Sequence, residues 1–284
     1  MKSLTRSMKL AEDRTQKVEI FKFFQGQFDE LDIYFIKLRE LKPEWFDEGI
    51  DEYLKILDQK IQSKLRITVF NQEEFAQDKW KILGNYPNVI EKLQQAMLSF
   101  LKIETFPIAE NNQLEKTDSI EVPFGDYVRC GYFHVYYLFY GLLQLKGKDL
   151  AYDVTRQIAE QFYSRPRPNG PKFDQLREYG EFIDGLCLQT HNFLSGEDDQ
   201  GHFINKVVGC IWGESLRVVE DPELMYFLIC HGDFFSHKSM NENFSLTRNY
   251  TILQGHGVCD FCYHDVRIHK EKIHPDQAFW DNLK

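Results

Sequence analysis

Apolar residues recur at helical spacing through most of the first 219 residues, and this pattern limits the fold more than any other feature. Because residues three and four apart share one side of a helix, helices are expected over 18–41, 45–65, 88–103, 127–145, 149–162, 173–194 and 203–219. After Pro222 the pattern changes to shorter apolar runs, which predict a buried strand at 225–229, a short helix at 234–240 and two hairpin strands at 244–253 and 258–266. The sequence predicts an α+β fold, mostly helical with a small antiparallel sheet formed near the C-terminus.

Residues 104–125 hold prolines, two adjacent asparagines and scattered charges, which together indicate a long loop. This loop is the best candidate for a boundary, because long loops in compact domains are often linkers or lids. The expected organisation is a flexible tail at 1–14, an N-terminal helical part at 15–103, the loop itself, and an α+β domain at 126–284.

Composition excludes several classes of function. The net charge is −10 and no basic stripe is visible, which argues against a nucleic-acid or anionic-membrane surface. No apolar run approaches the roughly 20 residues of a membrane span, and the N-terminus lacks the apolar core of a secretory signal. Six cysteines are too sparse for a disulfide scaffold, so we expect free thiols in a reducing cytoplasm. The expected partner is a small-molecule substrate, and a homo-oligomer stays open.

A Cys-x-x-Cys pair near the C-terminus, Cys259 and Cys262 with His256 and His264 close by, invites a zinc site. Both cysteines fall within a predicted strand, where side chains three residues apart point to opposite faces. A zinc knuckle instead needs both thiolates to converge at a turn. The expectation is therefore that no metal and no cofactor is bound.

The sequence Cys230-His231-Gly232-Asp233 follows the apolar run at 225–229. The junction of a strand and a helix is a common place for reactive groups, since amides at a helix start lower a thiol pKa or hold an anion. The simpler interpretation of each residue alone is a buried thiol at Cys230 and a helix N-cap at Asp233.

The segments 221–235 and 246–264 resemble the L-2-amino-thiazoline-4-carboxylic acid hydrolase family, and the resemblance extends over about residues 205–266. It rests on an apolar run ending in Cys-x-x-Asp, a Leu-x-Arg strand, a Thr-to-Gly turn and a closing Cys-Asp pair. These fall here on Cys230, Asp233, Leu246, Arg248, Thr251, Gly255, Cys259 and Asp260. The chain departs from the family where Phe261 and Cys262 stand in place of a common Arg.

The resemblance implies hydrolytic opening of a small cyclic amidine or thiazoline, in which water adds to the carbon between sulfur and nitrogen. Cys230 or Cys259 would attack as thiolate, or Asp233 or Asp260 would activate water. The candidate substrate-binding residues are Arg248 for a substrate carboxylate, His231 as a proton shuttle, and Thr251, Glu214 and His264. Glu214 is included because it falls among apolar residues of a predicted helix and would face a pocket.

Two other classes of function stay open: a non-catalytic small-molecule-binding or sensor module, and a zinc-stabilised interaction domain. The remaining histidines have no recognisable ligand spacing and are expected to be ordinary surface or core residues: His134, His191, His202, His237, His269 and His274.

Overall fold

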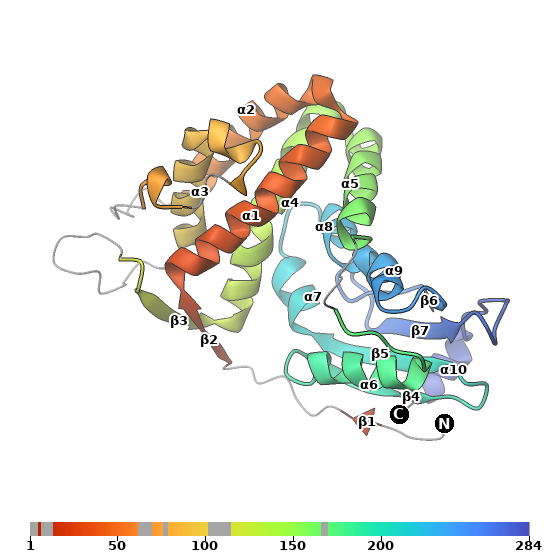
Figure 1. The fold of residues 1–284 in the computed structure, drawn as a ribbon. Helices are drawn as coiled ribbons and strands as arrows, with labels where there is room; N and C mark the ends of the chain where they lie inside the picture. The colour runs from red at the N-terminus through yellow and green to blue at the C-terminus, as the bar shows by residue number, and fades with distance from the viewer. Residues whose placement is uncertain are drawn as a thin grey trace. The chain divides into compact units, whose positions relative to one another are not determined.

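The computed structural model describes residues 5–6, 14–61, 70–75, 79–101, 115–165 and 170–283 (Figure 1). The chain divides into two compact units. One comprises residues 13–158, and the other comprises residues 159–284 with the N-terminal residues 1–12.

The unit of residues 13–158 is helical with one small hairpin. Its helices are α1 (Ile20–Leu41), α2 (Pro43–Lys60), α3 (Pro87–Phe100), α4 (Phe124–Lys146) and the first part of α5 (Lys148–Tyr163). Pro43 and Pro87 begin their helices, where the missing N–H costs nothing. Short 3-10 turns lie at η1 (Gln72–Glu74) and η3 (Leu83–Asn85), and β2 (Thr15–Glu19) pairs antiparallel with β3 (Ser119–Pro123).

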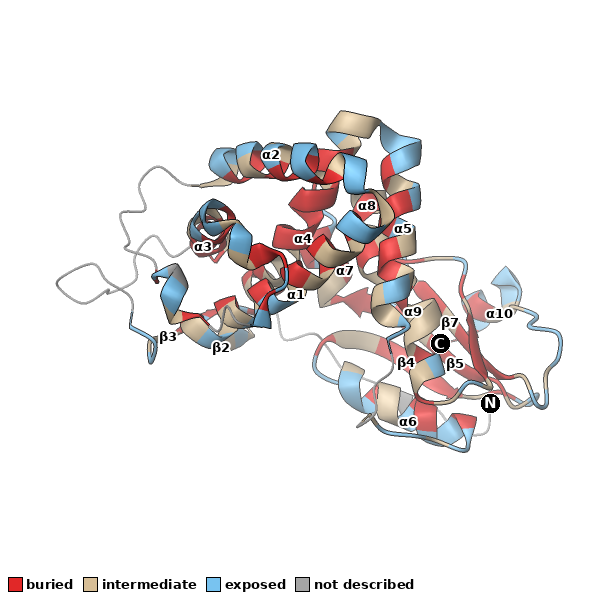
Figure 2. Cartoon of the chain, turned by 45° about the horizontal axis from the view of Figure 1, so that its top comes forward, coloured by how far each residue is buried: buried red, intermediate tan, exposed pale blue. Residues whose placement is uncertain are grey.

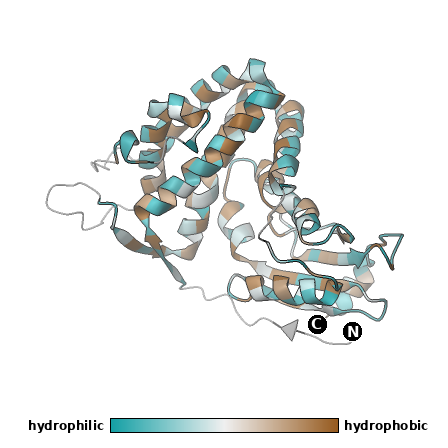
Figure 3. Ribbon diagram, in the orientation of Figure 1, coloured by the Kyte–Doolittle hydropathy of each residue, from teal (hydrophilic) through white to brown (hydrophobic). Residues whose placement is uncertain are grey.

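The apolar stripes predicted for these helices form the core of the unit. Apolar and hydrophilic residues gather on different sides of α1 (Figure 3), and its buried side includes Phe24, Phe28 and Phe35, all with no exposed surface (Figure 2). Helix α4 contacts α2 and is buried along much of its length. None of the helices formed by the described residues is long and apolar enough to cross a membrane.

The other unit is built on a five-stranded antiparallel sheet with the order β1-β4-β5-β7-β6. The strands are β1 (Thr5–Arg6), β4 (His191–Glu197), β5 (Phe203–Cys210), β6 (Phe244–Thr247) and β7 (Cys259–Asp265). The helices are α6 (Leu176–Cys187), α7 (Ile211–Leu216), α8 (Pro222–Leu228), α9 (Asp233–Ser236) and α10 (Gln277–Asn282), with 3-10 turns η4 (Cys230–Gly232) and η5 (His237–Ser239).

Two apolar clusters cover the two faces of this sheet. On one face Phe203 and Tyr263 pack against Tyr179 of α6. On the other face Ile204 and Cys262 pack against Trp280 of α10, and in Figure 1 the sheet lies between these two helices. The central strands are therefore buried on both sides.

The predicted α+β class is confirmed, with the larger sheet formed mainly in the C-terminal half. Three segments were predicted with the wrong type. Residues 191–194 belong to strand β4, which pairs with β5, and not to the end of the helix expected at 173–194. Residues 203–210 are strand β5 and not the start of a helix. Ile204, Val207 and Val208 are three and four residues apart, so this short strand mimics a helical pattern. Residues 225–228 belong to helix α8 and not to a strand, since Asp221 caps the helix through Leu224 N at 3.1 Å and Pro222 begins it.

The C-terminal hairpin forms with a register two residues from the predicted one. Strands at 244–253 and 258–266 joined by a four-residue turn would place Asn249 opposite Cys262, whereas Thr247 pairs with Cys262 in the structure. A shift of two keeps every side chain on its predicted face. Strand β6 also ends at Thr247, so residues 248–258 form a longer connection than the four-residue turn that was expected.

The division of the chain differs from the expected organisation, because the units meet at residues 158–159 and not in the loop at 104–125. Helix α4 was assigned to the second part, but its contacts with α2 and α3 place it in the unit of residues 13–158. Of the predicted loop at 104–125, residues 104–114 lie outside the described part and Ser119–Pro123 is a strand. Of the predicted tail, only residues 5–6 and 14 are described, and residues 5–6 pair with β4.

Candidate functional site

Arg248 lies just after strand β6, and its side chain is only 1% exposed. One guanidinium nitrogen donates to Asp233 Oδ2 at 2.6 Å, and another donates to the carbonyl oxygen of Cys230 at 2.7 Å. The arginine therefore joins the turn η4, helix α9 and the connection after β6. We call Cys230, Asp233, Arg248 and Cys259 the arginine cluster.

Aromatic rings enclose the guanidinium of Arg248. The ring centroids of Tyr226, Phe234 and Phe261 lie 5.7, 5.0 and 4.9 Å from its central carbon. This guanidinium is thus paired, stacked and closed to solvent, which leaves little room for a substrate carboxylate. In this structure Arg248 holds Asp233, and its role in binding a substrate carboxylate stays a prediction.

Asp233 differs from Arg248 in its access to solvent, since its side chain is 39% exposed. It is the first residue of α9 and has helical backbone angles, so it is not the N-cap that the simpler interpretation expected. Within the described residues its carboxylate binds Arg248 through Oδ2, and no hydrogen bond to Oδ1 is found. Burial raises the pKa of Asp233, and the charge of Arg248 opposes part of that rise.

The thiols around this arginine are poor thiolates. Burial raises the pKa of Cys230 well above its ordinary value, although Arg248 acts in the opposite direction. Burial also raises the pKa of Cys259 to about 11, even though Cys259 Sγ accepts the amide of Ile252 at 3.2 Å. Cys210, which sequence reasoning did not select, packs in the same apolar cluster as Cys259. All three thiols are therefore protonated near neutral pH.

Asp260 follows Cys259 directly but points to the opposite face of the sheet. Its Oδ1 accepts the amides of Asn249 and Tyr250 at 3.0 and 2.7 Å, and its Oδ2 lies 2.9 Å from Nε2 of His274. The side chain has almost no exposed surface. Asp260 therefore fixes the chain after β6 and does not join the arginine cluster.

The predicted substrate-binding residues other than Arg248 do not share one place. Thr251 is buried and closes a turn, since its hydroxyl donates to Gln254 Oε1 at 2.9 Å. Glu214 is exposed on α7, so the expectation that it faces a pocket is wrong. His231 lies 3.3 Å from Glu160 through its Nε2 and is surrounded by aromatic rings. His264 belongs to a second cluster on the face of Asp260.

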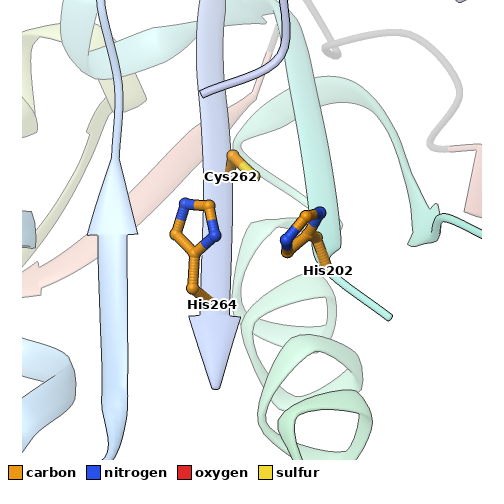
Figure 4. Close-up of side chains that lie close together, drawn as sticks. All are labelled: His202, Cys262 and His264. Atoms are coloured by element: carbon orange, nitrogen blue, oxygen red, sulfur yellow. The ribbon is translucent and has the colours of Figure 1, made fainter. Parts of the chain in front are cut away.

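That second cluster joins His264 to two neighbours from the same sheet. One potential ligand atom each of His202, Cys262 and His264 lies within 4.8 Å of the others, and all three residues are buried (Figure 4). Cys259 and Cys262 do point to opposite faces, as strand parity predicted, so Cys-x-x-Cys is not the pair that converges. His202 was missed because residues 203–210 were predicted as helix, and only the pairing of β5 with β7 brings it beside His264.

Comparison with known proteins agrees with the resemblance found in the sequence. The sequence model of the L-2-amino-thiazoline-4-carboxylic acid hydrolase family matches residues 144–263, a partial segment of the chain. This segment contains all four residues of the arginine cluster. No curated protein and no solved structure matches the chain.

Proposed function

We propose that this chain is a hydrolase that opens a small cyclic amidine of the thiazoline type, with Asp233 as the group that activates water. The observation that carries the proposal is the Asp233 carboxylate, which Arg248 holds through one oxygen while its side chain stays 39% exposed. Asp233 and Arg248 also lie in the segment that the hydrolase family model matches.

The position of Asp233 suits a general base. Its Oδ2 is fixed by a charged donor, which leaves Oδ1 to accept a proton from water. A raised pKa brings the carboxyl closer to working pH and makes it a better proton acceptor. Water would lose a proton to Asp233 and add to the carbon between sulfur and nitrogen. The electron pair of the C=N bond would go to the ring nitrogen. As the C–S bond breaks and a C=O bond forms, the hydroxyl proton would pass to the ring nitrogen and the proton on Asp233 to the leaving sulfur, giving a urea and a free thiol.

The cysteines fit a different role from the nucleophile that the resemblance implied. A thiol with a pKa of about 11, as at Cys259, carries little thiolate at neutral pH. Within the described residues no histidine accepts a hydrogen bond from Cys230 or Cys259, so no base is placed to activate either thiol. We therefore assign both cysteines to the apolar wall around Asp233 and Arg248.

The substrate is proposed to bind without a carboxylate contact to Arg248, because this guanidinium is already enclosed by Asp233 and three rings. Phe261 and Cys262 also stand where the family commonly has another Arg. We expect 2-amino-2-thiazoline and its 4-carboxylate to be opened with similar kcat/KM. A preference for the carboxylate of a hundredfold or more would contradict this assignment.

The test of the proposed function is turnover by the purified chain. Each thiazoline is incubated with the protein, and the protein is then removed by filtration. The filtrate is analysed for a product that is heavier than the substrate by one water and that carries a new thiol. Asp233→Asn keeps the shape and removes the base, so kcat is expected to fall by about 10²–10⁴-fold with an unchanged circular dichroism spectrum. The matched control is Glu214→Gln, because Glu214 is exposed on α7 of the same unit. Ligand binding without conversion by the unmodified chain would instead identify a binding module.

A further inference from the structure

A second cluster of chemically capable side chains lies on the face of the sheet opposite Arg248. Phe203 of β5 pairs with Tyr263 of β7, so His202 stands beside His264 at the end of the two strands. Cys262 and His264 are two apart on β7 and therefore share a face. Figure 4 shows the two imidazole rings side by side with Cys262 close to both, and the ring planes of His202 and His264 meet at 73°.

Hydrogen bonds determine which nitrogen of His202 is free to bind a ligand. Its Nδ1 lies 2.9 Å from Asp198 Oδ2, and a carboxylate only accepts hydrogen bonds. The proton of the neutral ring is therefore on Nδ1, and Nε2 presents a lone pair. A carboxylate behind an imidazole is the usual partner of a metal-binding histidine.

A chain of hydrogen bonds likewise leaves one ring nitrogen of His264 with a lone pair for a ligand. Its Nε2 lies 2.8 Å from the hydroxyl of Thr247, which lies 3.0 Å from Nδ1 of His274, and Nε2 of His274 lies 2.9 Å from Asp260 Oδ2. The Asp260 carboxylate can only accept, so Nε2 of the neutral His274 ring donates to it and Nδ1 of His274 accepts the hydroxyl proton of Thr247. The Thr247 oxygen therefore accepts a hydrogen bond from Nε2 of His264. The remaining atom, Nδ1 of His264, is buried, carries a lone pair and has no partner among the described residues.

We propose that His202, Cys262 and His264 bind one divalent transition-metal ion of the zinc class. Two imidazole nitrogens and one thiolate form a donor set typical of zinc. Tetrahedral coordination needs ligand atoms about 3.3–3.6 Å apart, and the three atoms already lie within 4.8 Å of one another. An ion would also satisfy the buried Nδ1 of His264, which otherwise has no partner among the described residues.

A pocket beside the cluster supplies the remaining coordination position. It has a volume of about 450 Å³, and its lining includes Asp198, His202 and His274. Water from this pocket would complete three protein ligands, as in zinc sites that keep an open position. The site is separate from the proposed hydrolase centre, because the metal ligands and the arginine cluster use opposite faces of the sheet.

The experiment measures metal binding by the full chain directly, without any assay of turnover. The purified protein is stripped with a chelator and titrated with Co²⁺, which reports a bound thiolate by a charge-transfer band, and Zn²⁺ is then added in competition. We expect one ion per chain and displacement of Co²⁺ by Zn²⁺. Cys262→Ser is expected to abolish the charge-transfer band, whereas Cys259→Ser, three residues away on the opposite face, is expected to keep it.

A further variant keeps the proposal testable if Cys262→Ser fails to fold. Asp198→Asn leaves all three ligands in place but removes the carboxylate behind His202, so the affinity for metal is expected to fall by about 10–100-fold. Failure of the unmodified chain to bind a stoichiometric ion would overturn the proposal. Equal loss of the charge-transfer band in both cysteine variants, or an unchanged affinity in Asp198→Asn, would also overturn it.

Discussion

At the scale of single residues, Arg248 is the side chain on which the candidate site depends. A buried guanidinium is costly unless its donors are satisfied, and here they bind a carboxylate and a backbone carbonyl from two different segments. The charge of Arg248 also limits the rise that burial causes in the pKa of Asp233. The arginine therefore sets both the position of the carboxylate and the pH at which it is ionised.

Arg248→Lys tests this dual role. A lysine keeps the charge but does not reproduce the planar fork that reaches Asp233 and the carbonyl of Cys230 together. The Asp233 carboxylate would be less stabilised, so its pKa would rise further. We expect the acid limb of the pH dependence of kcat/KM to move to higher pH and kcat to fall by roughly tenfold or more.

The control for this change is another arginine–aspartate pair in the same unit. Arg267 binds Asp265 at 2.5 Å, and its side chain is 45% exposed. Arg267→Lys is expected to leave the acid limb in place, since Arg267 binds Asp265 and not the proposed base Asp233. An acid limb that stays unmoved in Arg248→Lys would show that the titrating group is not Asp233.

At the scale of elements, the turn that carries Asp233 depends on a close approach to α5. A Cβ at Gly232 would lie 2.3 Å from Cδ2 of Tyr163, well inside the contact limit. The ring is held in place because the Tyr163 hydroxyl donates to the carbonyl of Leu228 at 2.9 Å. Glycine is therefore required between Cys230 and Asp233 for steric reasons, and its φ of −59° is open to any residue.

Gly232→Ala is expected to lower the free energy of unfolding by about 1–3 kcal/mol, because either the ring or the turn must move. Tyr163→Ala removes the ring, so adding Gly232→Ala to that variant should cost much less. Denaturant unfolding of both single variants and the double variant measures this coupling. Additive costs would mean that the two residues do not touch in solution.

The same elements show what sequence reasoning can and cannot reach. Helices α1 to α5 were placed correctly. Helices α1, α2, α3 and α5 each have one buried side and polar residues opposite, and α4 is a long apolar segment buried along much of its length. Strand β5 and helix α8 were assigned the wrong type, since short apolar segments carry no clear period. The grouping of Cys230, Asp233 and Arg248 came from the family resemblance, whereas the meeting of His202 with His264 needed the pairing of β5 with β7.

At the scale of the whole molecule, buried histidines make stability depend on pH. His134 in α4 has no exposed surface, and burial lowers its pKa to about 3. Asp184 acts in the opposite direction, because burial raises its pKa to about 6 and its protonated form is favoured in the folded state. On acidification the effects of His134 and Asp184 on the free energy of unfolding partly cancel. The contribution of His134 must therefore be isolated by substitution.

His134→Leu isolates the contribution of His134 to the pH dependence of stability, because leucine fills similar space and does not titrate. In the folded chain His134 stays neutral down to about pH 3, whereas in the unfolded chain it binds a proton below its ordinary pKa of 6.5. Its contribution is therefore complete above pH 6.5 and is lost as the pH falls. Between pH 7 and pH 5 the unmodified chain is expected to lose about 2 kcal/mol more unfolding free energy than His134→Leu.

Urea unfolding at the two pH values measures the difference, and His256→Gln, at an exposed position, serves as the control. Equal losses in the unmodified chain and His134→Leu would mean that His134 is not held neutral by burial.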